Sequence, residues 1–95
     1  MKPCFYMLAS QKNGTIYAGS TSDIVARIEQ HRSRPEGSFT ARYGVIRLVH
    51  VEFYDLMVDA IQREKRVKKW KRAWKVELIE STNPDWNDLR LTMPW

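Results

Sequence analysis

The sequence predicts a small α/β sandwich, in which helices flank a three-stranded antiparallel sheet in the order β-β-α-β-α-α. Two short aromatic and aliphatic runs meet at an Asn-Gly turn, and a third run rich in Val, Ile and Leu lies between one helical pattern and two more. The 95 residues suffice for one domain over residues 1–95, with residues 84–95 expected as a tail that packs back on it.

The composition is that of a folded, basic protein. Hydrophobic residues make up 43% of the chain, and 16 Lys and Arg against 11 Asp and Glu give a net charge of +5. Eight of these basic residues lie between Gln62 and Lys75, where Glu64 is the single acidic residue. A basic cluster of this density favours a polyanionic partner.

The number of cysteines and the N-terminal sequence indicate the cellular compartment in which the protein is expected. Cys4 is the single cysteine, which excludes a disulfide framework or a cysteine-based metal cluster within the chain. The N-terminal apolar run is too short and too soon interrupted by Ser10, Gln11 and Lys12 for a signal peptide or a membrane span. We therefore expect an unprocessed cytoplasmic protein that does not associate with membranes.

The first two strands are expected on either side of Asn13-Gly14, the strongest short signal for a hairpin. If Asn13 and Gly14 are the two central turn residues, Ser10 pairs with Tyr17. Because side chains alternate along a strand, Tyr6 and Tyr17 then point from the same face of the ribbon.

The remaining elements follow from periodicity and from capping residues. They are a helix within Ser22–Arg34 capped by Ser22 or Asp23, a polar connection over Arg34–Gly44, a strand over Val45–Tyr54, a helix from Leu56 to about Trp70 capped by Asp55, and a second helical stretch that ends at Asn83-Pro84. In the tail, we expect Trp86, Leu89, Leu91 and Trp95 to pack back on the domain.

The first helix carries polar residues where a core-facing stripe would be apolar. The stripe runs Ile24, Arg27, Ile28, His31. Arginine can grip a phosphate with two hydrogen bonds, and histidine can exchange a proton near neutral pH. The alternative is that Arg27 and His31 run along the helix edge into water while Val25 completes a narrower core face.

The next helix places a carboxylate on its inward stripe. Glu64 lies in helical register with Met57, Ala60 and Val67, whereas the outer faces are almost entirely lysine and arginine. One interpretation is an ion pair with a neighbouring Arg or Lys. The other is a single ligand to Mg²⁺ or Mn²⁺, since Mg²⁺ commonly takes one or two protein carboxylates and completes its shell with water and substrate phosphate.

Taken in order, these residues resemble the GIY-YIG nuclease family, whose domain occurs in homing endonucleases and in the N-terminal half of the UvrC excision-repair protein. The resemblance is to the small stand-alone bacterial members and covers nearly the whole chain. It departs from the family pattern where Cys4-Phe5-Tyr6 keeps only the tyrosine of the first motif and where Ala18 replaces the isoleucine of the second. The matching segments are Phe5-Tyr6-Met7-Leu8, Tyr17-Ala18-Gly19, Arg27, His31, Arg63-Glu64-Lys65 and Lys68-Lys69-Trp70.

The resemblance implies a metal-dependent endonuclease that hydrolyses DNA phosphodiester bonds, in repair or recombination. It implies that Tyr6 and Tyr17 stand near the scissile phosphate, that Arg27 contacts it, and that His31 assists a tyrosine. Glu64 would hold the one divalent cation, Mg²⁺ or Mn²⁺. Which tyrosine activates the water stays open, because a phenol with a pKa of about 10 needs a nearby cation or a proton acceptor to act at neutral pH.

The basic stretch is the expected DNA-binding surface. Two alternatives remain: a non-catalytic nucleic-acid-binding module in which Trp70 and Trp74 stack bases, and a basic interaction domain whose lysines form a solvated helix face and whose tryptophans are core. Glu64 separates the enzyme from the binding module, which has no need of it. We expect a monomer that selects DNA by shape or through a partner protein. The predicted DNA contacts are Arg63, Lys65, Lys68, Lys69, Lys71 and Arg72.

Overall fold

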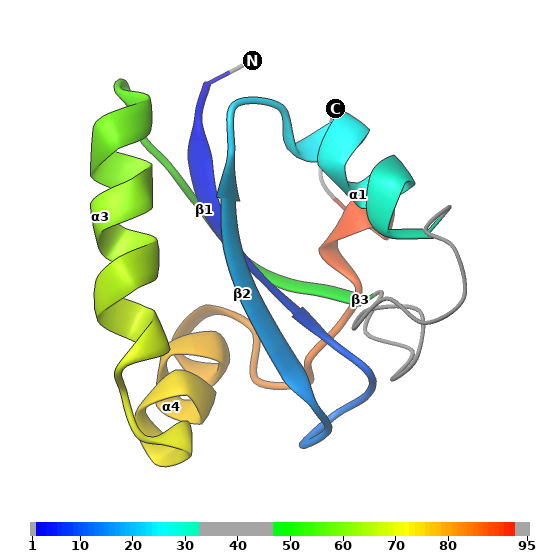
Figure 1. The fold of residues 1–95 in the computed structure, drawn as a ribbon. Coiled ribbons are helices and arrows are strands. Elements are labelled where there is room, and N and C mark those ends of the chain that lie inside the picture. Colours follow the sequence, from blue (N-terminus) through cyan, green and yellow to red (C-terminus); the bar gives the residue numbers. More distant parts are fainter. Residues whose placement is uncertain (1, 33–46, 93–95) are drawn as a thin grey trace.

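The structure is a computed structural model, which describes residues 2–32 and 47–92. Its three strands form one antiparallel sheet in the order β2-β1-β3 (Figure 1), which confirms the predicted α/β class and element order. The elements are β1 (Cys4–Ala9), β2 (Ile16–Thr21), α1 (Ile24–Arg32), β3 (Arg47–Phe53), α3 (Met57–Lys68), α4 (Arg72–Thr82) and the 3₁₀ helix η1 (Leu89–Leu91).

The sheet is covered on both faces (Figure 1). Helices α3 and α4 lie on one face, and α1 and η1 lie on the other. Side chains of the central strand β1 alternate between the two layers, so all six of its residues are buried. Phe5 and Met7 pack with Val67 of α3 and Ile79 of α4. The second layer consists of Cys4, Tyr6, Leu8, Ile24, Ile28 and Leu48.

The hairpin forms at the predicted turn but with a different register. Ser10 donates its N–H to Thr15 O over 3.0 Å, so the predicted pairing of Ser10 with Tyr17 is wrong by two positions. The loop is longer than a two-residue turn, and Asn13 takes the left-handed conformation at φ 62°. A shift of two keeps each side chain on its face, so Tyr6 and Tyr17 still point the same way.

Helix α1 begins where Asp23 caps it, as predicted. Asp23 Oδ1 accepts a hydrogen bond from the N–H of Ala26 at 3.2 Å. Ile24 and Ile28 are buried, whereas Val25 is 41% exposed. The alternative in which Val25 completes the core face is therefore wrong, and Arg27 lies on the buried stripe.

Helix α3 begins without the predicted cap. Leu56 precedes the helix and makes no side-chain capping bond, while Asp55 pairs with Lys2 Nζ at 2.9 Å. The prediction that Asp55 caps this helix is wrong, because the helix begins at Met57, one residue later than expected, which puts Leu56 at the N-cap position. Helix α4 ends at the predicted place, where Asn83 donates its side-chain amide to Val49 O at 3.1 Å.

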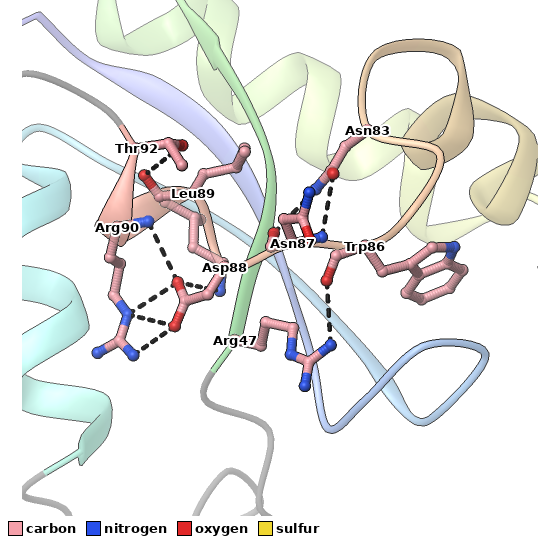
Figure 2. Close-up of polar contacts among 9 residues, drawn as sticks. Arg47, Asn83, Trp86, Asn87, Asp88, Leu89, Arg90 and Thr92 are labelled. Atoms are coloured by element: carbon pink, nitrogen blue, oxygen red, sulfur yellow. Dashed lines mark hydrogen bonds and ion pairs between the residues drawn. The ribbon is translucent and has the colours of Figure 1, made fainter.

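The C-terminal segment is bound to β3 by polar contacts (Figure 2). Arg47 Nη1 donates to Trp86 O at 3.1 Å, and Asp88 Oδ1 accepts from Leu48 N at 3.3 Å. Trp86 is fully buried, as predicted. Asp88 is in turn paired with Arg90, so this segment covers the end of β3.

Parts of the predicted tail and connection differ or fall outside the described residues. Leu91 is 82% exposed, so the prediction that it packs on the domain is wrong: the short η1 helix turns Leu89 toward the core and Leu91 outward. Trp95, the connection over Arg34–Gly44 and the first two residues of the predicted strand lie outside the described ranges. Within residues 2–32 and 47–92, no helix has the length and apolar character needed to span a membrane.

Candidate active site

Three of the predicted residues converge on the face covered by α1. Tyr6 projects from β1 and Tyr17 from β2, with ring centroids 6.4 Å apart and planes inclined by 38°. Helix α1 follows β2 after a two-residue connection, so its first turns return over the end of that strand. Arg27 on α1 thereby lies beside the Tyr6 hydroxyl, with which its guanidinium interacts.

Gly19 makes room for the Tyr6 phenol. The two residues are directly opposite each other in the β1–β2 ladder. A Cβ atom at Gly19 would lie 2.6 Å from Tyr6 Oη and 2.7 Å from Cζ, which is closer than real Cβ atoms come to other atoms. The third position of Tyr17-Ala18-Gly19 is thus occupied by glycine because the phenol lies over its Cα.

The surroundings of Tyr6 keep its hydroxyl protonated. Burial and the neighbouring Tyr17 raise the pKa of Tyr6, and the charge and hydrogen bond of Arg27 lower it by less. The net result is a pKa above the usual value for a phenol. Tyr6 therefore carries its proton at neutral pH.

Glu64 reaches the edge of the sheet from α3. Ser20 on β2 donates its hydroxyl hydrogen to Glu64 Oε1, and Lys68 Nζ lies 2.6 Å from Oε2. The side chain of Glu64 is 20% exposed, in agreement with the expected inward position. Burial raises the pKa of Glu64. The hydrogen bonds from Lys68 and Ser20 and the charges of Lys68 and Arg27 lower it by more, so the net pKa is below the usual value. The carboxylate is therefore ionised at neutral pH.

Arg27 joins the two halves of the site. Its charge acts on both Tyr6 and Glu64, although Arg27 is on α1 and Glu64 is on α3. Figure 1 shows the end of β2 running between these two helices, which lie on opposite faces of the sheet. Since β2 is an edge strand, nothing in the sheet separates the two faces beyond it. The tyrosines, the arginine and the glutamate therefore share one edge of the molecule.

The donor set at this edge fits a divalent cation bound by a single carboxylate. Among the residues that the structure describes, no group of three or more His, Cys, Asp or Glu could hold a metal ion. Glu64 is nevertheless ionised and partly exposed, and the ammonium of Lys68 at Oε2 shows that a cation can reach it. One carboxylate supplemented by water and substrate phosphate is a common way of binding Mg²⁺.

A groove adjoins Tyr17 on the side of α3 and α4. Its volume is about 310 Å³, and its walls include two lysines. A concave, cationic surface beside half-buried Tyr17 suits a phosphate chain. The lining residues are Ile16, Tyr17, Ala18, Lys68 and Lys75.

The predicted DNA contacts divide into two groups. Lys65, Lys69 and Lys71 are exposed. Arg72 donates from Nη2 to the hairpin carbonyls of residues 13 and 14, at 2.8 and 2.7 Å, and so fixes the turn against α4. Arg63 forms two hydrogen bonds to Glu52, at 3.0 and 3.2 Å. Arg63, Arg72 and Lys68 thus form hydrogen bonds or ion pairs within the protein, although Lys68 and Arg72 are also exposed.

Glu52 is a polar centre that sequence reasoning missed. Besides Arg63, it contacts His50 Nε2 and the Tyr54 hydroxyl, each at 2.7 Å. Burial raises the pKa of Glu52, but the hydrogen bonds from His50, Arg63 and Tyr54 outweigh it and bring the pKa to about 2. These residues link β3 to α3 and support the helix that carries Glu64.

Sequence reasoning also missed Ser20 and Lys75. Ser20 follows directly after the Tyr17-Ala18-Gly19 motif, and alternation along β2 places it on the face opposite Tyr17, which α3 covers. That alternation was the available signal for Ser20. Lys75 ends the basic stretch that was expected to bind DNA, although it was not among the predicted DNA contacts. His31 belongs to α1, but its side chain lies outside the described part of the structure.

Comparisons with known proteins agree with this geometry. The family model for the GIY-YIG catalytic domain matches residues 2–77. The chain is 36% identical over 72 residues to a UPF0213 protein of Syntrophus aciditrophicus, an alignment that covers 75% of this chain and 82% of that protein. It is 29% identical over 76 residues to a UPF0213 protein of Staphylococcus aureus, covering 80% of this chain and 93% of that one.

A solved structure shares the fold. The solution NMR structure of a UPF0213 protein from Bacillus halodurans superposes with a TM-score of 0.57 at 28% sequence identity, and 93% of each chain is covered. The family match extends over most of the chain and includes Tyr6, Tyr17, Arg27 and Glu64. The resemblance seen in the motifs is confirmed: this chain belongs to the GIY-YIG family, a family of nucleases.

Proposed function

We propose that this protein is a divalent-metal-dependent endonuclease that hydrolyses phosphodiester bonds of DNA. The observation that carries the proposal is the convergence at the edge strand β2: the Tyr6 and Tyr17 rings lie 6.4 Å apart, Arg27 is hydrogen-bonded to Tyr6, and Ser20 binds Glu64. Side chains from β1, β2, α1 and α3 thereby meet at one edge of the sheet. GIY-YIG nucleases generally depend on a divalent metal ion, and the partly buried carboxylate in a basic helix supports the same dependence here.

Arg27 is the residue that we assign to the reacting phosphate. Its planar guanidinium can donate two parallel hydrogen bonds to phosphate oxygens. Hydrolysis places additional negative charge on the pentacoordinate phosphate, and a fixed cation at that position stabilises the transition state more than the ground state. Because its hydrogen bond with Tyr6 holds Arg27 in place before substrate arrives, little reorganisation is needed.

The two tyrosines differ in a way that separates their roles. Tyr6 is fully buried, its pKa is raised, and its hydroxyl is hydrogen-bonded to Arg27, so we assign it to holding Arg27 in position beside the phosphate. Tyr17 lines the groove, and we assign it to the attacking water. A phenol can act as a base at neutral pH if a cation lowers its pKa or if a histidine accepts its proton, and we assign that second task to His31.

Glu64 is the residue that would hold the Mg²⁺ or Mn²⁺ ion, which when bound would stabilise charge on the phosphate and the leaving oxygen. Ser20 fixes one carboxylate oxygen by donating to it. Lys68 occupies the other oxygen and lines the groove as well. Lys68 can therefore turn from the carboxylate to a phosphate without leaving the site.

The DNA is placed along the groove beside Tyr17. Lys68 and Lys75 line it, and the exposed Lys65, Lys69 and Lys71 extend its positive charge. A chain of this size has little surface for reading bases, so we assign substrate selection to DNA shape or to a partner protein. We place the activity in the cytoplasm, in DNA repair or recombination.

A non-catalytic nucleic-acid-binding module is the second candidate. The observation that favours it is the ion pair between Glu64 and Lys68, which satisfies the carboxylate without a metal ion. In that case the carboxylate would keep the helix in place, and DNA would bind without being cut.

Incubation of the purified protein with labelled duplex, branched and single-stranded DNA distinguishes the two candidates. The endonuclease should cut at least one substrate with Mg²⁺ or Mn²⁺ and none with EDTA. Glu64→Gln, which keeps the shape of the side chain, is the matched control for contaminating nucleases. Binding without cleavage in every metal would establish the binding module instead.

A further inference from the structure

Two tryptophans form an exposed aromatic surface where α3 passes into α4. Trp70 and Trp74 lie edge to face, with ring centroids 6.2 Å apart and planes at 81°. Trp74 is 50% exposed, whereas Trp70 is half-buried and packs against the core. The alternative in which both tryptophans are core residues is therefore wrong for Trp74.

The two rings are held by cations and by the core. Arg63 lies over Trp70, with Cζ 5.1 Å from the ring centroid, and Lys71 Nζ lies 5.3 Å from the centroid of Trp74. Arg63 is itself fixed by Glu52. Side chains fixed in this way lose little conformational freedom when a ligand stacks on them, so the aromatic surface is preorganised for binding.

A cavity of about 480 Å³ opens beside the rings. This volume lies in the range of roughly 300–1,000 Å³ that is typical of small-molecule sites. Its polar lining offers acceptors: the Glu77 carboxylate, and the Ser81 hydroxyl, whose hydrogen is donated to Leu78 O at 2.7 Å. Aromatic walls with acceptors at the edge fit a nucleobase that presents amino hydrogens, such as cytosine. The lining residues are Trp70, Trp74, Glu77, Leu78 and Ser81.

The charges around this pocket favour a polyanion over a second copy of the chain. Lys69 and Lys71 are exposed beside it, and Lys75 follows Trp74 along α4. Two copies that each carry a net charge of +5 would bring like charges together at this face. A nucleic acid provides phosphates for the lysines and bases for the rings.

We propose that the Trp70–Trp74 pocket binds an unpaired base of the DNA strand whose backbone follows the groove from Tyr17. Lys75 lines that groove, and Trp74, the residue before it in α4, lines the pocket about a quarter turn away around the helix, so the groove and the pocket lie on neighbouring sides of α4. The inference rests on the proposed function in taking DNA as the ligand. It specifies the substrate class: DNA with an unpaired nucleotide close to the cleaved bond, in preference to a fully paired duplex.

Binding measured by fluorescence anisotropy in EDTA tests this proposal without any cleavage. Three labelled probes of equal length are compared: a paired duplex, a duplex with one unpaired dC in a bulge, and the same bulge with an abasic residue in place of dC. The bulged and abasic probes carry the same phosphates, so their difference reports the base alone. The proteins are wild type, Trp74→Ala, Trp74→Phe and Leu91→Ala, the last as a control that removes an exposed apolar side chain on the opposite face.

Wild type should bind the dC bulge about 5- to 150-fold more tightly than the abasic bulge, the range for stacking one base on an aromatic side chain. Trp74→Ala should bring the ratio of dC-bulge to abasic-bulge affinity close to one and leave the affinity for paired duplex unchanged. Trp74→Phe should keep part of the wild-type ratio, and Leu91→Ala should keep all of it. A ratio near one in wild type would overturn the proposal. So would a Trp74→Ala protein that loses affinity equally for all three probes, or one whose sedimentation shows that Trp74 holds a dimer together.

The result is separable from that of the proposed nuclease. Cleavage without base discrimination would overturn the pocket and leave the nuclease standing. Discrimination without cleavage in any metal would retain the pocket and remove the nuclease.

Discussion

Replacing Gly19 by alanine tests the packing that holds Tyr6 in place. The added Cβ would lie 2.6 Å from Tyr6 Oη, whereas ordinary van der Waals contact begins at 3.4 Å, so the hydroxyl must move by about 0.8 Å. Tyr6 is fully buried, and its rigid ring cannot rotate away cheaply. Overpacking of this kind costs roughly 1–3 kcal/mol of unfolding free energy. For a chain of this size, that corresponds to a decrease in Tm of about 4–24 °C.

The same displacement should reduce cleavage. If Tyr6 holds Arg27 against the phosphate, a misplacement approaching 1 Å costs on the order of a hundredfold in rate. Thermal unfolding followed by circular dichroism gives the stability, and single-turnover cleavage at a temperature where both proteins are folded gives the rate. Ile79→Val, which removes one methyl group from the other core layer at a cost of about 0.5–1.5 kcal/mol, controls for stability loss alone. Gly19→Ala with unchanged Tm and an unchanged rate would refute the packing argument.

Three further predictions concern the metal ligand, the DNA surface and the polar centre. Glu64→Gln should abolish metal-dependent cleavage, since the amide keeps the shape of the side chain but loses its charge. It should also lower the affinity for Mn²⁺ in calorimetric titrations with DNA present, and an undiminished Mn²⁺ affinity would exclude Glu64 as the ligand. Lys65, Lys69 and Lys71 are changed together to Gln, and Lys68 is kept because it pairs with Glu64. The slope of log binding constant against log salt concentration should become shallower by about 0.9 for each phosphate that is no longer neutralised. An unchanged slope would show that these lysines do not contact DNA. The pKa of Glu52, lowered from 4.5 to about 2, represents about 3 kcal/mol of stability that is present above pH 4.5 and lost as the pH falls toward 2. Glu52→Gln should therefore lower the free energy of unfolding in urea by about that amount at pH 7 and by much less at pH 2, and an equal loss at both would contradict the pKa.

Periodicity in the sequence predicted faces but not distances. Alternation along the strands placed Tyr6 and Tyr17 on one side of the sheet, and the helical stripe placed Arg27 and Glu64 inward. The hairpin register was wrong by two, because Asn13 takes a left-handed conformation inside a longer loop and side-chain alternation is unaffected by a shift of two.

Contacts between residues distant in sequence were beyond pattern reasoning. Asp55 was expected to cap a helix but is paired with Lys2, and the Glu52 carboxylate that binds Arg63 was not singled out. Each outcome depends on which partner the fold brings within a few ångströms, and neither spacing nor composition encodes that. For Ser20, alternation along β2 gives the face on which it lies, but its bond to Glu64 forms only because α3 lies on β2.

The central claim is that Arg27 acts on the reacting phosphate, and the single-turnover cleavage rate of Arg27→Ala, measured together with its DNA affinity, tests it most directly. The rate should fall by about a hundredfold or more, while the affinity changes far less because many other cations remain. Arg27→Lys, which keeps the charge but not the planar fork, should recover part of the rate. If rate and affinity instead fall by the same modest factor, Arg27 is an ordinary DNA-binding residue, and the proposed catalytic centre is wrong.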